Sequence, residues 1–420
     1  MIEHIKKVRE RLKDRIEDNS VVILFSGKAP HKSTDQFYAY EPQRNFYYVT
    51  NLQAPNLIFM MIKGKEEYKT YLFLEENTEH IIQWEGARLS KETAAELSGI
   101  PVLNMRYITQ FETFFGTVMN YARSPFGTPP KKLYLDLYHV SPSEQPVALK
   151  QAEWIIENYK ELTVASVNEH TSYLRMFKSA AEIEHLKTAI KHTDIGLNTI
   201  MRNIPHRHNE FQLSADFSHA ILLDGSEGNA FNTIAASGKN ATVLHYVDNS
   251  SRLSPNDLIL FDLGALHQGY CADISRTYPL SGVFSARQKQ LYTIVLDVNN
   301  ACIEYVKPGI TWQELNDYAK SLLIEKTKAI GLIKEDEEIS RYYYHSIGHF
   351  LGLDVHDVGH YHIPFEPGMV LTIEPGLYIA EEGIGIRIED DILVTEDGAV
   401  NLSQDIIKTI EDIENFMKEA

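Results

Sequence analysis

Residues 258–264 read Leu-Ile-Leu-Phe-Asp-Leu-Gly, an apolar run that ends in an acid, one further residue and a glycine. Residues 370–376 read Val-Leu-Thr-Ile-Glu-Pro-Gly and have the same form. Each run is followed by a second β-rich stretch with one acid inside it, at residues 271–277 and 385–393. The pattern predicts two β-ribbons that form matching halves of one domain, with one inward acid on each strand.

The acids of these four strands are Asp262, Asp273, Glu374 and Glu389. A carboxylate buried in an apolar strand is costly unless it is paired with a positive charge or bound to a metal. One such residue would be interpreted as an acid at a strand end or in a salt bridge. Four of them in two matched ribbons indicate a shared cation site instead.

The charge of this site predicts how many metal ions it holds. Four ionised carboxylates would leave two charges uncompensated around one divalent ion, whereas two ions neutralise them. Ligands that are mostly oxygen suit Mn²⁺, with Co²⁺, Zn²⁺ or Fe²⁺ as alternatives. The two cysteines, Cys271 and Cys302, cannot build a thiolate site or a disulfide framework. Two ions about 3.5–4 Å apart can share a hydroxide and polarise a carbonyl, which predicts metal-assisted hydrolysis.

Histidines four residues apart offer nitrogen ligands to the same site. His345 and His349 have the spacing of the helical zinc motif H-E-x-x-H, but Ser346 stands where that motif has its glutamate. We therefore expect one imidazole ligand, with the other histidines around the site. Arg387 lies two residues before Glu389 and shares its face of a strand. It either orients a ligand or forms a structural ion pair.

Length and composition predict two domains and a cytoplasmic location. The chain has 420 residues, of which 44% are hydrophobic, which is enough for two sizeable cores. Its formal net charge of −18 argues against nucleic acid as a partner. Apolar runs such as residues 57–62 are shorter than the about 20 residues that span a bilayer, so no membrane span is expected. The charged N-terminal stretch lacks the apolar core of a signal peptide.

Local signals place a domain boundary near residue 172. Residues 1–172 alternate short strands, such as 21–25 and 71–73, with helical stretches, which predicts an α/β domain. Residues 173–420 are predicted to be an α+β domain, in which long helices pack against an antiparallel sheet. Its helices are expected to begin at capping boxes that open at Ser179, Ser285 and Thr311.

These segments together resemble the pita-bread metallopeptidases, in the branch that contains Xaa-Pro aminopeptidase (aminopeptidase P) and Xaa-Pro dipeptidase (prolidase). The matching residues are 244–246, 262–264, 270–277, 345–359, 372–376 and 383–391. Residues 44–50, Arg-Asn-Phe-Tyr-Tyr-Val-Thr, resemble the creatinase-type N-terminal domain of the same family. The resemblance implies a domain of that type over residues 1–172 and a catalytic pita-bread domain over residues 173–420.

The resemblance also implies roles for the matching residues. Asp262 and Asp273 would chelate one metal ion. Asp273 and Glu389 would bridge it to a second ion, and His349 and Glu374 would complete the coordination of that second ion. Glu374 would also shuttle the proton of a bridging water. The histidines implied to hold substrate and stabilise the tetrahedral intermediate are His245, His345 and His356.

The activity implied by the resemblance is removal of the N-terminal residue from peptides with proline in second position, by attack of a metal-bridging hydroxide. A Xaa-Pro dipeptidase with the same metals is the alternative, although residues 377–379 and 383–392 are nearer to the aminopeptidase branch. A methionine aminopeptidase is disfavoured because it would not usually carry an N-terminal domain of this length.

Two further alternatives would keep the fold without this chemistry. One is a non-catalytic module that binds peptides or histones, and the other is a creatinase-like hydrolase without metal. Every metal-ligand position carries the expected residue type, which argues against both. The partners implied by the resemblance are peptides with a Xaa-Pro N-terminus, together with further copies of the chain in a homodimer or homotetramer.

Overall fold

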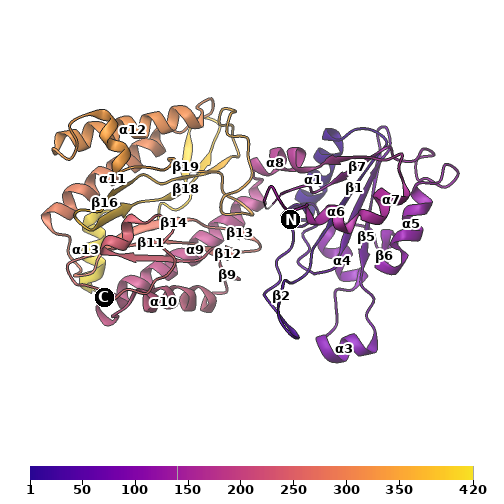
Figure 1. The fold of residues 1–420 in the computed structure, drawn as a ribbon, viewed down its shortest axis with the longest axis horizontal. Coiled ribbons are helices and arrows are strands. Elements are labelled where there is room, and N and C mark those ends of the chain that lie inside the picture. The colour runs from indigo at the N-terminus through magenta and orange to yellow at the C-terminus, as the bar shows by residue number, and fades with distance from the viewer. Residues whose placement is uncertain (140, 420) are drawn as a thin grey trace. The chain divides into compact units, whose positions relative to one another are not determined.

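Two compact units make up the chain, Met1–Arg175 and Met176–Ala420. The computed structural model describes residues 1–139 and 141–419, and Figure 1 shows the helices and strands. Helix α8 (Asn168–Met176) ends at the division between the units. The boundary predicted after residue 172 falls inside this helix and stays a prediction. No helix within the described ranges is both long and apolar enough to cross a membrane.

The first unit is built around one six-stranded sheet with the order β6-β5-β4-β1-β7-β8 (Figure 1). The strands of this sheet are β1 (Ser20–Phe25), β4 (Ile58–Lys63), β5 (Tyr68–Leu74), β6 (Met105–Tyr107), β7 (Lys132–Leu135) and β8 (Thr163–Ser166), and β2 (His31–Ser33) and β3 (Gln36–Phe37) form a separate two-stranded sheet. Its helices, besides α8, are α1 (Ile2–Arg15), α2 (Arg44–Thr50), α3 (Glu79–Glu85), α4 (Lys91–Ser98), α5 (Phe111–Val118), α6 (Val147–Gln151) and α7 (Glu153–Asn158).

Strand β1 explains why this unit is an α/β layer. All six of its residues are buried, which is typical of a strand that is covered on both faces. It pairs in parallel with β7 and antiparallel with β4. Val21 and Ile23 form one core with Phe111 and Phe115 of α5 and with Ile155 of α7. The α/β character predicted for this part of the chain is therefore observed.

The second unit consists of two halves, each with its own pair of long helices (Figure 1). The first half contains α9 (Ala180–Asn203), α10 (Glu210–Leu223), β9 (Gly228–Asn229), β10 (Ile234–Ser237), β11 (Leu258–Leu263), β12 (Ala265–His267), β13 (Tyr270–Cys271) and β14 (Ile274–Pro279). The second half contains α11 (Ala286–Tyr305), α12 (Trp312–Ala329), β15 (Val370–Ile373), β16 (Gly376–Ile379), β17 (Ile384–Arg387), β18 (Asp390–Val394), β19 (Ala399–Asn401) and α13 (Ile410–Glu419).

Each half has an outer antiparallel strand pair that encloses an inner hairpin. Strand β11 pairs with β14 around the β12–β13 hairpin, and β15 pairs with β18 around the β16–β17 hairpin. The continuous strands predicted at residues 271–277 and 385–393 are therefore wrong, because each is interrupted. The interruptions fall at Asp273 and Glu389, between β13 and β14 and between β17 and β18. Both acids lie where the chain passes from the inner hairpin to the outer pair.

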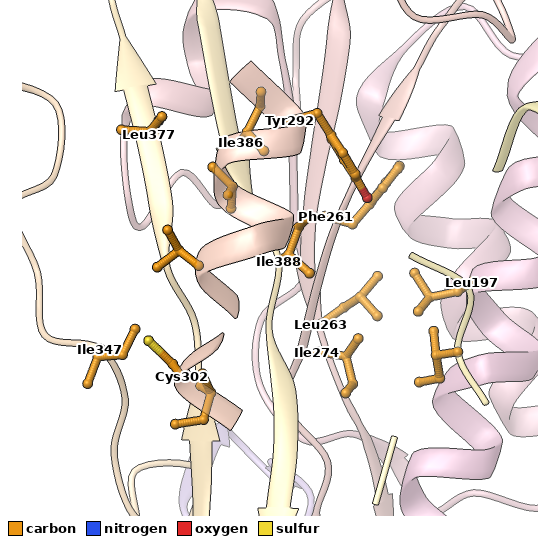
Figure 2. Packing of buried hydrophobic residues seen from close by; sticks show 14 of the residues in the cluster. Leu197, Phe261, Leu263, Ile274, Tyr292, Cys302, Ile347, Leu377, Ile386 and Ile388 are labelled. Carbon is orange, nitrogen blue, oxygen red and sulfur yellow. The ribbon is translucent and has the colours of Figure 1, made fainter. Parts of the chain in front are cut away.

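The three predicted capping boxes are confirmed, and they start the helices that cover these strands. Ser179, Ser285 and Thr311 each accept a hydrogen bond from a main-chain N–H of the first turn of α9, α11 and α12. Figure 2 shows Leu263 and Ile274, from β11 and β14, beside Leu197 of α9 in the buried core. Helix packing thus holds the strands that carry the acids.

Gly264 follows β11 at a point where two main-chain segments nearly touch. A Cβ atom on Gly264 would lie 1.7 Å from the carbonyl oxygen of Ala272. Because Ala272 directly precedes Asp273, this contact sets the distance between the β11 end and the second acid. Only glycine permits the approach, because any side chain would collide with rigid main chain.

We expect Gly264→Ala to lower the free energy of unfolding by about 1–3 kcal/mol, because the added methyl group pushes the two segments apart. Thermal unfolding measured by calorimetry should show a Tm lower by about 2–4 °C for each kcal/mol. The matched control is Gly398→Ala, since a Cβ atom there meets nothing within 4 Å. A Tm for Gly264→Ala equal to that of the control would contradict the packing argument.

Candidate active site

One cavity of about 340 Å³ in the second unit brings together the predicted site residues. They are His245, Asp262, Asp273, His345, His349, His356, Glu374, Arg387 and Glu389. The remaining lining residues are Leu244, Ser346, Gly348 and Tyr361. Residues from six separate segments of the sequence, at 244–245, 262, 273, 345–361, 374 and 387–389, therefore converge on one space.

Burial and mutual repulsion make the acids of this cavity costly to ionise. Asp273 and Glu389 are only 4% and 2% exposed. Burial raises the pKa of Asp273 well above its ordinary value, and the charges of Asp262 and Asp391 raise it further. Burial likewise raises the pKa of Glu389 well above its usual range, with Asp273 as the next cause. Ionised together, these groups require positive charge among them.

The buried acid oxygens fit a pair of divalent cations. Among the described residues, Asp262 Oδ1 and Asp273 Oδ1 are buried and have no hydrogen-bond partner. Ligand atoms of Asp262, Asp273 and Glu389 all lie within 4.8 Å of one another, and those of His349, Glu374 and Glu389 do so as well. The two groups share Glu389, which is the arrangement that two neighbouring cations with a common carboxylate ligand would need.

The tautomer of His349 follows from its neighbours. Its Nδ1 lies 3.0 Å from the carbonyl oxygen of Phe350, which can only accept, so Nδ1 carries the proton. The other nitrogen, Nε2, lies 3.3 Å from Asp273 Oδ2 and 3.7 Å from Glu374 Oε1. A lone pair that faces two carboxylates is suited to a cation between them. No helix is found at residues 342–350, which agrees with the exclusion of a helical zinc motif.

Arg387 lines the cavity and connects the two ribbons. It is 3% exposed, and its Nη2 donates to Asp262 Oδ2 at 2.6 Å. Its Nε donates to Ser275 Oγ at 2.8 Å, and that hydroxyl donates to Glu389 Oε2 at 2.7 Å. The two interpretations of Arg387, ion pair and orienting residue, thus describe the same contacts, because its ion-pair partner is a predicted metal ligand.

His345 belongs to a hydrogen-bond chain that ends at Arg387. Its Nδ1 lies 2.7 Å from the carbonyl oxygen of Ser346, so its Nε2 accepts the Tyr378 hydroxyl at 2.8 Å. Tyr378 in turn accepts from Arg387 Nη1 at 3.0 Å. Burial and the Arg387 charge lower the pKa of His345 to about 4. Both ring nitrogens are engaged, so His345 contacts substrate directly only if one of these bonds breaks.

His356 and His245 differ from His345 in their neighbours and in their exposure. The His356 ring centroid is 4.1 Å from that of His349, and its ligand atom lies within 4.8 Å of those of His349 and Asp273. His356 is therefore placed as a possible ligand as well as a substrate contact. Burial lowers the pKa of His356, which favours the neutral ring. His245 is exposed and lines the same cavity from an irregular segment.

Sequence patterns did not single out Ser275 and Tyr378, although both contact Arg387. Strand alternation was the available signal. Ser275 lies two residues after Asp273 in the chain and pairs with Asp262 in the ladder. Tyr378 lies two residues beyond Gly376, which is paired with Arg387 across the β16–β17 hairpin. Neither signal distinguishes a functional contact from an ordinary packing contact.

Comparisons with known proteins cover nearly the whole chain. The model of metallopeptidase family M24 matches residues 184–396, and that of the aminopeptidase P N-terminal domain matches residues 5–125. The Xaa-Pro aminopeptidase of Haemophilus influenzae is 31% identical over 435 residues, which cover 99% of this chain and 97% of that protein. A solved structure from Bacillus anthracis has a TM-score of 0.94 and 45% identity, over 100% of this chain and 98% of that chain. Zinc-substituted Escherichia coli aminopeptidase P in complex with product has a TM-score of 0.89 and 28% identity, with the same coverage of both chains.

These matches confirm the predicted fold class, an α/β domain of the aminopeptidase P type followed by an α+β pita-bread domain. They also confirm the predicted family resemblance. The family carries divalent metal ions, and the acid-lined cavity described above fits them.

We expect removal of divalent metal to destabilise the protein, because the acids then repel one another in a buried space. Adding Mn²⁺ to chelator-treated protein at about 100 times its Kd should stabilise the fold by about 2.7 kcal/mol, seen as a rise in Tm. The same addition should raise the Tm of Asp273→Asn by much less. A Tm that responds to none of Mn²⁺, Co²⁺ and Zn²⁺ would contradict the cation site.

Proposed function

The chain belongs to metallopeptidase family M24 and is a metal-dependent Xaa-Pro aminopeptidase, and we propose that its reaction takes place in the cavity that Asp262, Asp273 and Glu389 line. The observation that supports this assignment is the convergence of buried acid oxygens without hydrogen-bond partners on a single space. A peptide would enter with the bond before its proline beside these oxygens.

We propose that Asp262, Asp273, His349, Glu374 and Glu389 hold two divalent ions. Mn²⁺ is the preferred ion because the ligands are carboxylate oxygens with a single imidazole, and Co²⁺, Zn²⁺ and Fe²⁺ are the alternatives. The Escherichia coli relative has been solved in a zinc-substituted form, which supports zinc as one alternative. When bound, such ions supply a water nucleophile of lowered pKa and polarise the scissile carbonyl.

Glu374 is proposed to move the proton in this reaction. Burial raises the pKa of Glu374, which favours uptake of a proton. It would accept a proton from the attacking water and deliver it to the prolyl nitrogen as the C–N bond breaks. The oxygen of that water ends on the carbonyl carbon of the released residue, so the atoms of one water molecule are divided between the two products.

The remaining polar residues are proposed to hold the substrate and the ligands. His245 and His356 would donate hydrogen bonds to the peptide and to the oxyanion of the tetrahedral intermediate. His345 would support them through Tyr378, to which it is hydrogen-bonded. Arg387 would hold Asp262 in place by the 2.6 Å contact and balance part of the acid charge.

We also propose a cytoplasmic location and a homodimer or homotetramer. The location is supported by the low cysteine content, since Cys271 and Cys302 are the two cysteines of the chain and both are buried. The oligomeric state is supported by the family resemblance alone. Light scattering of the purified protein would measure it.

We expect Asp273→Ala and Glu389→Ala each to lower kcat/KM by at least about a hundredfold, because both acids are proposed to contact both ions. Metal analysis of the same samples should show fewer than two bound ions per chain. The matched control is Glu182→Gln, since Glu182 is a buried carboxylate of the same unit that caps α9 away from the cavity. Activity of either alanine variant within about tenfold of the parent would contradict the bridging assignment.

Substrate length separates this function from that of a dipeptidase. The metal-loaded protein should cleave a Xaa-Pro-Yaa tripeptide at a higher kcat/KM than a Xaa-Pro dipeptide. The tripeptide places peptide chain beyond proline, where a dipeptidase instead closes around a carboxylate. Cleavage of the dipeptide alone would contradict the aminopeptidase assignment.

A further inference from the structure

His245 lies on a segment that has little secondary structure of its own. After the short 3-10 helix of residues 238–242, residues 244–250 belong to no helix or strand, and residues 244–245 form only a turn. The side chain of His245 is exposed in the cavity. Its position therefore depends on side chains elsewhere that hold this segment.

One buried carboxylate accepts hydrogen bonds from several residues of the segment 237–251. Glu210, the first residue of α10, is fully buried and accepts five hydrogen bonds. Its Oε1 accepts from the main-chain N–H and the hydroxyl of Ser237, both at 2.7 Å, and from Asn240 Nδ2 at 2.9 Å. Its Oε2 accepts from the Tyr246 hydroxyl and from the Ser251 N–H, both at 2.8 Å. The donors come from both ends and the middle of residues 237–251.

Every hydrogen-bond partner of the Glu210 carboxylate donates to it, so the residue at this position must accept hydrogen bonds at both of its terminal atoms. Glutamine offers one acceptor oxygen and one NH₂ donor. In either orientation its NH₂ group would face a main-chain N–H, that of Ser237 or that of Ser251. Glu210→Gln therefore removes contacts that no rotation of the amide restores, although it keeps the size of the side chain.

The residues on either side of His245 reinforce this placement. Leu244 and Tyr246 pack against the apolar cluster that contains Tyr378, and His245 between them lines the cavity, as Leu244 also does. The same segment runs against β17, since a Cβ atom on Gly385 would lie 2.1 Å from the Ala241 carbonyl oxygen. It is thus placed relative to the strand that carries Arg387.

We propose that Glu210 is a positioning residue for catalysis, which holds residues 237–251 so that His245 faces the bound peptide. The proposal rests on the proposed role of His245. Glu210 is fully buried and is not among the residues that line the cavity. The effect of Glu210 on the reaction then passes through the position of His245, whereas a residue that only stabilises the fold would act equally with or without this imidazole.

A double-mutant cycle on the full-length, metal-loaded protein tests this. Glu210→Gln should lower kcat/KM by about tenfold to a hundredfold, because a displacement of about 1 Å has an effect of this size. In the His245→Ala background the same change should lower it by less than about threefold, because the residue that it positions is absent. Bound metal should stay at the parent level in all four proteins.

Two further variants complete the experiment. Tyr246→Phe keeps the ring but removes one donor to Glu210, so it should give a smaller loss with the same dependence on His245. It decides the question if Glu210→Gln does not fold. Glu182→Gln, an equally buried carboxylate that caps α9, should change kcat/KM by the same factor with and without His245.

The outcomes separate this proposal from the proposed function. If Glu210→Gln and Tyr246→Phe each lower kcat/KM by the same factor with and without His245, the positioning role of Glu210 is wrong. A large loss of activity in His245→Ala would in that case still support the role of His245. Parent activity of His245→Ala would overturn both. A loss that depends on His245 and leaves metal content unchanged supports the proposal.

Discussion

Repulsion among buried carboxylates is the constraint on which the second unit depends. Two like charges about 4 Å apart repel by about 4 kcal/mol at an effective dielectric of 20, and four acids share this cavity. The pKa values of Asp273 and Glu389 rise because of burial and this repulsion. Such a site persists only if the rest of the fold holds the acids together and if cations balance them.

The doubled architecture supplies that restraint. Asp273, Glu374 and Glu389 lie where the chain passes between an outer strand pair and an inner hairpin, and Asp262 lies near the end of β11, so strand ladders hold the main chain beside each acid. The ladders rest on a continuous apolar core to which the long helices contribute. At Gly264 the main chain approaches the segment before Asp273 too closely for any side chain. Stability elsewhere in the unit thus offsets the strain of the site.

Around the acids, hydrogen bonds place charge at fixed positions. Arg387 touches Asp262 directly and reaches Glu389 through Ser275. Arg387 also donates to the Tyr378 hydroxyl, which donates to His345. The direction of these hydrogen bonds is set by the carbonyl oxygen of Ser346, which can only accept from His345. Both nitrogens of His345 are used in hydrogen bonds, whereas His245 is exposed and lines the cavity.

The sequence by itself determined the acids, the histidines, the helix starts and the two-domain organisation. These are local signals, because an acid in an apolar run or a serine before a helix has meaning within a few residues. Only the tertiary structure decided where the strands break, that Ser275 and Tyr378 meet Arg387, and that Glu210 holds the segment of His245. The partners of Arg387 and Glu210 depend on close packing between distant segments, and no pattern along the chain encodes which donors will meet a given carboxylate.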